Sequence, residues 1–190
     1  MKICWGDRNW AEALIPYTTR PIRAREQDGV EYHFTDEAGL LRLRQAGKVI
    51  ELREYNTVHG VWSYFTVDDD HIDLDREDYL GIGVLESYRK IRDYFGPDRV
   101  IPIYIQVEDR NRLERALKRE RKQARPSYEE LCRRFLADQR DFSEEKLKEA
   151  GIERRFSNDE DRKICMDEVA DYIRELRFTA APPHAHSSPL

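Results

Sequence analysis

The chain has 190 residues, a formal net charge of −5 at pH 7, 39% apolar residues and 37% charged residues. This length supports a domain with a true hydrophobic core, the apolar content excludes a wholly disordered chain, and the negative charge argues against binding to a nucleic acid polymer. Without a signal-peptide pattern or an apolar run near the ~20 residues of a membrane span, we expect a cytoplasmic protein with no membrane partner.

The first third of the chain predicts a small, mostly β lobe. β-rich runs stand in three places, at residues 14–20, 31–34 and 48–67, with turns at Gly29 and Gly60. Between the second and third runs we expect a short helix. Thr35 is its candidate N-cap, acidic residues fill its first turn, and Gly47 ends it.

From residue 68 the pattern changes to that of an α/β body. The acidic run 68–78 is typical of a solvated connector. Two nearly continuous apolar runs follow at 79–85 and 100–107, and such runs are typical of strands buried on both faces of a parallel sheet. A helix-like segment closed by Gly96 separates them, so the body is predicted to be α/β.

The last third of the chain predicts helices. A strongly basic helix is expected at 109–123, and a second one after Pro126 with Ser127 and Glu130 as a capping box. A strand at 154–158 is expected before a final helix. The residues of that helix spaced to face a core are Cys165, Val169, Tyr172, Ile173 and Leu176.

The cysteines and histidines do not indicate a metal site. Cys4, Cys132 and Cys165 are far apart and lack CxxC spacing, as expected for reduced thiols. His184 and His186 lie in residues 179–190, which we expect to form a flexible tail without ordered ligands. We therefore predict no metal site.

The order of these parts resembles the guanylate kinase family. Residues 18–34, TTRPIRAREQDGVEYHF, look like its GMP-phosphate segment, and residues 56–67, 79–88 and 121–145 look closest to a divergent bacterial branch. The resemblance implies a P-loop-kinase-like parallel sheet with flanking helices. It also implies a single domain over residues 1–178, with a β-rich GMP-binding lobe at about 17–67 and a helical lid at about 109–142.

Carried over by position, the resemblance implies two sets of substrate-binding residues. Those for the phosphate of GMP are Arg20, Arg23, Tyr32 and Tyr64, and those for guanine are Glu51 and Thr66. Guanidinium and phenol groups can satisfy the acceptor oxygens of a phosphate dianion. The alternatives are an ordinary charged turn for the first set and, for Glu51, a solvent-facing position on a strand.

For ATP, which enters with Mg²⁺, the resemblance implies catalytic arginines on the helix pair. These are Arg119, Arg121 and Arg134, with Arg133 as a competitor for the last position. Asn158 resembles a family residue near the adenine. Arginines suit phosphoryl transfer because most of its catalysis is positioning and charge stabilisation. The alternative for each arginine is a solvated basic helix face.

The resemblance fails in the first sixteen residues. The family's G-x-x-x-x-G-K-[ST] loop, which cradles the ATP phosphates, is absent from MKICWGDRNWAEALIP. We interpret residues 1–3 as the remnant of a strand and 10–14 as the remnant of a helix. Gly81 and Gly83 stand where the family usually has acidic residues, and a family serine is here Pro16 or Tyr17.

Three interpretations follow. The first is a kinase by descent that converts GMP and ATP into GDP and ADP, with turnover severely reduced by the missing loop. The second is a non-catalytic module that binds GMP or a phosphopeptide, although no protein partner can be predicted. The third, which the intact GMP and lid segments favour, is a gene-level deletion or a mis-called start.

Overall fold

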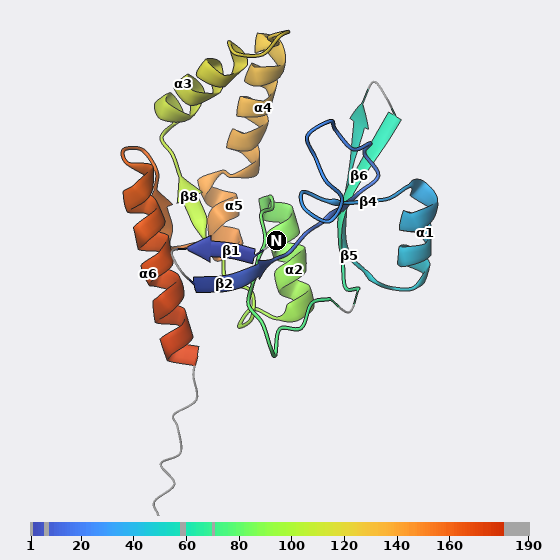
Figure 1. Cartoon of the computed structure of the whole chain (residues 1–190). Helices are drawn as coiled ribbons and strands as arrows, with labels where there is room; N and C mark the ends of the chain where they lie inside the picture. The colour runs from blue at the N-terminus through green and yellow to red at the C-terminus, as the bar shows by residue number, and fades with distance from the viewer. Residues whose placement is uncertain (1, 6–7, 58–59, 70, 181–190) are drawn as a thin grey trace, which may run out of the picture. The chain divides into compact units, whose positions relative to one another are not determined.

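The computed structural model describes residues 2–5, 8–57, 60–69 and 71–180. The chain divides into two compact units, Met1–Ile101 and Pro102–Leu190, and Figure 1 labels most of their helices and strands. The single domain expected over residues 1–178 stays a prediction. The last helix runs to Ala180, and the rest of the expected tail, with His184 and His186, lies outside the described residues.

A small three-stranded sheet of unit 1 has the order β1-β2-β7. β1 (Lys2–Trp5) pairs antiparallel with β2 (Arg8–Ala13), and β2 pairs in parallel with β7 (Tyr79–Leu80). The interpretation of residues 10–14 as a helix remnant is wrong, because most of them belong to β2. The backbone N–H of Leu14 extends the parallel pairing by donating to the carbonyl of Leu80 at 3.1 Å.

The apolar run 79–85 is a strand only at its start. After Leu80 the chain leaves the sheet, Ile82 is 95% exposed, and helix α2 (Leu85–Phe95) has already begun at the end of the run. Gly81 and Gly83 explain the difference, because glycine loses more conformational entropy in a strand than any other residue. The helix ends as expected at Gly96, which has φ 99°.

A four-stranded sheet, in the order β4-β3-β6-β5, forms the expected β lobe. Its strands are β3 (Tyr17–Thr18), β4 (His33–Phe34), β5 (Val49–Thr57) and β6 (Gly60–Val67). The predicted pair of strands within residues 48–67 is confirmed as an antiparallel hairpin. The strand expected at 14–20 is shorter, since Pro16 has no N–H to donate to a ladder.

One face of this sheet packs under helix α1 (Glu37–Gln45). The buried cluster consists of Leu40, Phe65 and Val67, with Tyr17, Leu43, Val49 and Leu52 packed against it. Phe65 is 0% exposed and stands opposite Leu52 in register. Because side chains alternate along a strand, the residues between these core positions lie on the other face.

Helix α1 is capped by a different residue from the one expected. The N-cap is Asp36, whose Oδ1 accepts a hydrogen bond from the N–H of Gly39 at 2.7 Å. Thr35 belongs to the preceding extended segment, since its N–H donates to the carbonyl of Thr18 at 3.0 Å. The predicted stop at Gly47 is confirmed, with φ 70° just after the C-cap Ala46.

Unit 2 contains a two-stranded parallel sheet of β8 (Tyr104–Gln106) and β9 (Arg155–Ser157). Its helices are α3 (Asp109–Glu120), α4 (Tyr128–Asp141), α5 (Glu144–Glu149) and α6 (Arg162–Ala180). Its buried core is formed by Leu131, Leu147, Ala150, Ile152, Phe156, Cys165 and Ala170. The strand expected at 100–107 is shorter, because Pro102 interrupts its start.

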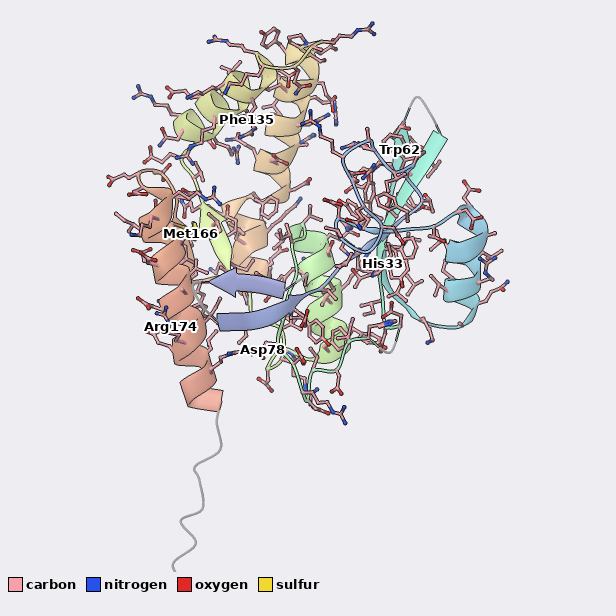
Figure 2. All side chains as sticks on the ribbon, viewed as in Figure 1. His33, Trp62, Asp78, Phe135, Met166 and Arg174 are labelled. Atoms are coloured by element: carbon pink, nitrogen blue, oxygen red, sulfur yellow. The ribbon has the colours of Figure 1, made fainter. Side chains whose placement is uncertain are left out.

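Helices α3 and α4 pack through an arginine and an aromatic ring. The guanidinium carbon of Arg112 lies 4.3 Å from the ring centroid of Phe135, which is labelled in Figure 2. The predicted capping box of α4 is wrong. The side chain of Ser127 makes no cap hydrogen bond. Its N–H, which a capping box would pair with Glu130, donates instead to Oε1 of Glu120 at 2.6 Å, because Arg133 and Arg134 of the next turn occupy the carboxylate of Glu130.

Within the described residues, no helix combines the length and apolar content needed to cross a membrane.

Candidate nucleotide site

The face of the four-stranded sheet opposite the core is polar. β5 places Glu51 and Arg53 on it, opposite Thr66 and Tyr64 of β6 in antiparallel register. Directly opposed side chains of antiparallel strands point to the same side of the sheet. Phe65, between the two β6 residues, points into the core. We call these four residues the polar face.

Arg20 lies beside the polar face and is 3% exposed. Its Nη1 donates to Oε2 of Glu26 and its Nη2 to Oε1, both at 2.9 Å, and Nη1 also donates to the carbonyl of Pro21 at 2.8 Å. The hydrogen bonds with Glu26 raise the pKa of Arg20, and those from Arg20 lower the pKa of Glu26. The lobe therefore holds this cation in one fixed orientation.

Aromatic rings surround Arg20. Its guanidinium carbon lies 5.4 Å from the ring centroid of Tyr32 and 5.5 Å from that of Phe34. The ring of Tyr32 meets that of Tyr64 edge-on, with centroids 5.7 Å apart. The structure thus brings together Arg20, Tyr32 and Tyr64, which come from three separate segments of the lobe. Figure 2 labels His33, on β4, and Trp62, on β6, in the same lobe.

Arg23 contributes a second cation to this part of the lobe. Its backbone N–H donates to Oε2 of Glu26 at 2.9 Å, so one carboxylate organises both arginine segments. Its side chain is exposed and makes no ion pair with any described residue. Of the two arginines expected to bind phosphate, Arg23 is therefore the one whose hydrogen-bond donors are free.

Glu51 is buried rather than solvent-facing, with a side chain 0% exposed. Its Oε1 accepts a hydrogen bond from Oγ1 of Thr66 at 2.9 Å, so the two residues expected to contact guanine are neighbours. Arg53 donates two further hydrogen bonds to the carboxylate. Its Nε donates to Oε2 at 3.0 Å and its Nη2 to Oε1 at 3.3 Å.

Sequence reasoning missed two residues of this site. Arg53 stands two positions after Glu51, and the period of two along a strand was a signal that could have found it. Glu26 left a weaker signal, because it lies in an irregular loop where spacing predicts no partner. Both are charge partners of residues that were identified.

The arginines expected on the helix pair of unit 2 fall into two classes. Arg119, in the last turn of α3, and Arg121, at its C-cap, are exposed and form no ion pair with the described residues. Arg133 and Arg134 share one carboxylate, donating to Glu130 through their Nε atoms at 2.6 and 2.7 Å. Hydrogen bonds from Arg133 and then Arg134 lower the pKa of Glu130 to about 2.

Asn158 follows β9 and is tied to helix α3. Its carbonyl accepts from Nη1 of Arg115 at 2.7 Å. Next to it, Oδ1 of Asp159 accepts from the N–H of Glu108 at 2.8 Å and from Nδ2 of Asn111 at 2.9 Å, and the bond from Asn111 lowers the pKa of Asp159. Asn158, the residue expected near the adenine, therefore lies in the segment after β9 that is hydrogen-bonded to α3 and its N-cap.

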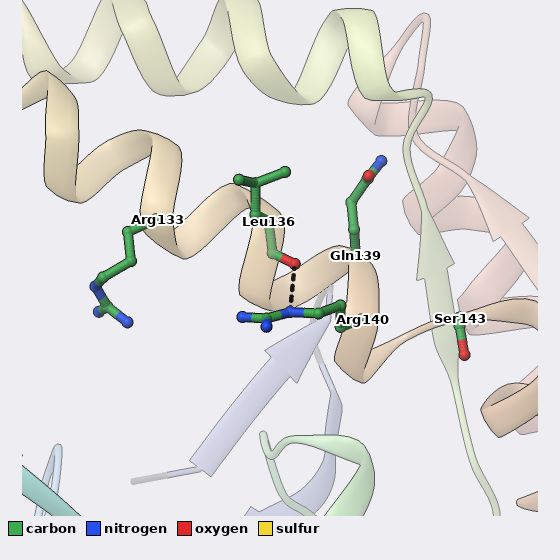
Figure 3. A pocket seen from close by; sticks show the side chains of 5 residues that line it. All are labelled: Arg133, Leu136, Gln139, Arg140 and Ser143. Carbon is green, nitrogen blue, oxygen red and sulfur yellow. Dashed lines mark hydrogen bonds between the residues drawn. The ribbon is translucent and has the colours of Figure 1, made fainter.

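A hollow lies along α4. Its lining residues are Arg133, Leu136, Gln139, Arg140 and Ser143 (Figure 3). Nε of Arg140 donates to the carbonyl of Leu136 at 3.3 Å, and the side chain of Leu136 is 58% exposed. Of the arginines considered from the sequence, Arg133 alone lines this hollow.

The described residues contain no group of three or more His, Cys, Asp or Glu side chains arranged to hold a metal ion. Cys132 is exposed and Cys165 is buried, and both are free thiols. Burial raises the pKa of Cys165, which makes it a poorer thiolate donor.

Comparison with known proteins decides the family. The model of the guanylate kinase family matches residues 7–145, which include the β lobe and the helix pair of unit 2. The chain belongs to the guanylate kinase family. A guanylate kinase of Leifsonia xyli subsp. xyli is 30% identical, over 88% of this chain and 60% of that protein. A guanylate kinase of Bordetella pertussis is 44% identical over 59 residues, 31% of this chain and 25% of that protein.

The chain thus spans about 60% of the length of the Leifsonia guanylate kinase. Among solved structures, the guanylate kinase of Anaplasma phagocytophilum matches with a TM-score of 0.56 and 23% identity, over 86% of this chain and 73% of that one. This likeness supports the predicted α/β guanylate kinase fold.

Proposed function

We propose that unit 1 binds GMP and that the chain has descended from an enzyme that transfers a phosphoryl group from ATP to GMP, giving ADP and GDP. One observation carries the proposal: the cluster of Arg20, Tyr32 and Tyr64 adjoins the buried pair of Glu51 and Thr66 on one lobe. Fixed cations and phenol groups suit a phosphate, and the neighbouring polar pair suits a base.

The phosphate would be held mainly by Arg23, with the hydroxyls of Tyr32 and Tyr64 as further donors. Three of the five N–H donors of Arg20 go to Glu26 and Pro21, and a hydrogen bond with Tyr64 also raises its pKa, so at most one donor is left for a ligand. The carboxylate of Glu26 offsets most of the charge of Arg20, so its attraction for an anion is reduced. In this proposal Arg20 mainly holds the loop in place, and Arg23 makes the direct contact with the phosphate.

ATP with Mg²⁺ is the co-substrate in this proposal, with Mg²⁺ entering on the ATP phosphates. Arg119 and Arg121 make no ion pair with the described residues, whereas Arg134 would have to leave Glu130 to act. Residues 1–16 contain no phosphate-cradling loop. Because loss of one preorganised charge-stabilising group costs about 10²–10³ in kcat, we expect its turnover to be very low.

Calorimetry and a kinase assay test the proposal. We expect GMP to bind with higher affinity than guanosine, and Glu51→Ala to weaken GMP more than inorganic phosphate. Failure to detect GMP binding would overturn the proposal. An affinity that does not depend on the base would favour a module that recognises only phosphate, such as one for phosphopeptides. ADP production from MgATP and GMP at ordinary kinase rates would contradict the expected effect of the missing loop.

A further inference from the structure

The carboxylate of Glu51 has little hydrogen-bonding capacity left. An ionised carboxylate offers about four acceptor positions, and three are in use, two by Arg53 and one by Thr66. Guanine presents two donors on one edge, its ring N–H and its 2-amino group. A carboxylate with one free position cannot accept both, so Glu51 as it stands cannot read guanine by itself.

Arg53 is the accessible member of this pair. Its side chain is 16% exposed, whereas that of Glu51 is 0% exposed. A guanidinium has five N–H donors, and Arg53 uses its Nε–H and one N–H of Nη2 on Glu51. Three donors therefore remain, in a planar fork whose orientation Glu51 fixes.

The position of Arg53 suits a base whose phosphate lies at the tyrosine cluster. Arg53 stands directly opposite Tyr64 in the β5–β6 register, one step nearer to the cluster than the pair of Glu51 and Thr66. The ring of Tyr64 in turn contacts that of Tyr32. A ligand that touches both tyrosines therefore meets Arg53 before it meets Glu51.

We propose, resting on the GMP-binding function above, that Arg53 is the residue that selects the base. Its fork donates to the 6-oxo group and N7 of a purine, the pair of acceptors that arginine matches in a bidentate way. Glu51 is a positioning residue that orients the fork. The ligand class is a 6-oxopurine nucleoside monophosphate, with or without a 2-amino group.

This assignment predicts an unusual order of affinities. GMP and IMP share the 6-oxo group and N7, so they should bind within about 3-fold of each other. AMP carries an amino group at position 6 and should bind about 5- to 150-fold more weakly, the range for one bidentate contact. Recognition by a free Glu51 would instead favour GMP over IMP, since IMP lacks the 2-amino group.

Calorimetry of the unaltered chain with the three nucleotides is the first test. Equal binding of GMP and IMP with weaker AMP supports the assignment. GMP binding at least about 10-fold tighter than IMP overturns it, while the proposed GMP-binding function stands. If none of the three binds, both proposals fail together.

Variants provide the second test. Arg53→Ala frees the carboxylate of Glu51, so a preference for GMP over IMP of about 10-fold should appear. Arg53→Lys keeps a cation on Glu51 but loses the fork, so the preference over AMP should shrink while the fold is retained. Arg42→Ala, at an exposed arginine of α1, is the matched control and should leave the ratios unchanged. Unchanged ratios in both Arg53 variants would overturn the assignment.

Discussion

The guanidinium of Arg20 and the carboxylate of Glu26 form a two-point ion pair inside the β lobe, with both contacts at 2.9 Å. The same carboxylate accepts the backbone N–H of Arg23. A single acidic side chain thus shapes the loop that carries both arginines expected to bind phosphate, which makes Glu26 a structural element of the site.

The stability provided by this pair should depend on pH. Hydrogen bonds from Arg20 lower the pKa of Glu26 in the folded lobe, so its contribution is present above the ordinary glutamate pKa of 4.5 and is lost as the pH falls through the lower folded value. We expect Glu26→Gln to lower the melting temperature at about pH 6 and to differ less from the unaltered chain toward about pH 3. A Glu54→Gln control on β5 should show no such trend, and a constant difference for Glu26→Gln would contradict the linkage.

Arg23 should carry most of the direct grip on the phosphate. Hydrogen bonds to charged groups contribute about 1.5–3 kcal/mol, so Arg23→Ala should weaken GMP about 10- to 100-fold in calorimetry. Inorganic phosphate should weaken in parallel. Arg25→Ala removes an exposed neighbouring charge and should change affinity only slightly. Equal losses in the two variants would indicate general electrostatic attraction instead of a specific contact.

The core under α1 should depend on Phe65. Its side chain is 0% exposed and belongs to the cluster with Leu40 and Val67. Phe65→Ala should lower the free energy of unfolding by about 3–5 kcal/mol, the usual cost of emptying a packed aromatic site. Leu41 of α1 is 54% exposed, so Leu41→Ala should change the free energy of unfolding by no more than about 0.5 kcal/mol. Urea denaturation of both variants measures the difference.

Gly47 should contribute to stability only through its backbone conformation. It has φ 70°, and a Cβ built on it would meet no atom within 4 Å, so substitution tests strain without steric overlap. Gly47→Ala should destabilise the lobe by about 1–2 kcal/mol. Gly47→Asn should cost less, since asparagine tolerates left-handed conformations. An alanine variant as stable as the unaltered chain would show that the helix can end in another way.

The β lobe shows how far local pattern reaches. Alternation and turn residues were enough to predict the hairpin within residues 48–67 and the stop of α1 at Gly47, because both depend on neighbours in sequence. The N-cap of α1 was placed one residue early, at Thr35. Pairing of Thr35 with Thr18 decided that boundary, and a single segment does not contain this information.

The apolar run 79–85 shows where pattern misleads. Its composition predicts a buried strand, yet Ile82 is 95% exposed and Leu85 begins a helix. Hydrophobic runs predict burial only when a partner layer is present to cover them. The capping box at Ser127 and Glu130 failed for a related reason, since two arginines compete for the same carboxylate.

By itself the sequence determined the family, the α/β class and the identities of the candidate phosphate residues, because these depend on residue type and order. Only the tertiary structure decided which charges of the candidate site are already paired: Arg20 with Glu26 and Glu51 with Arg53, whereas the side chain of Arg23 makes no ion pair with the described residues. The physical reason is that a charge is neutralised by what lies within about 4 Å of it in space. Folding sets that distance, and residue order alone does not.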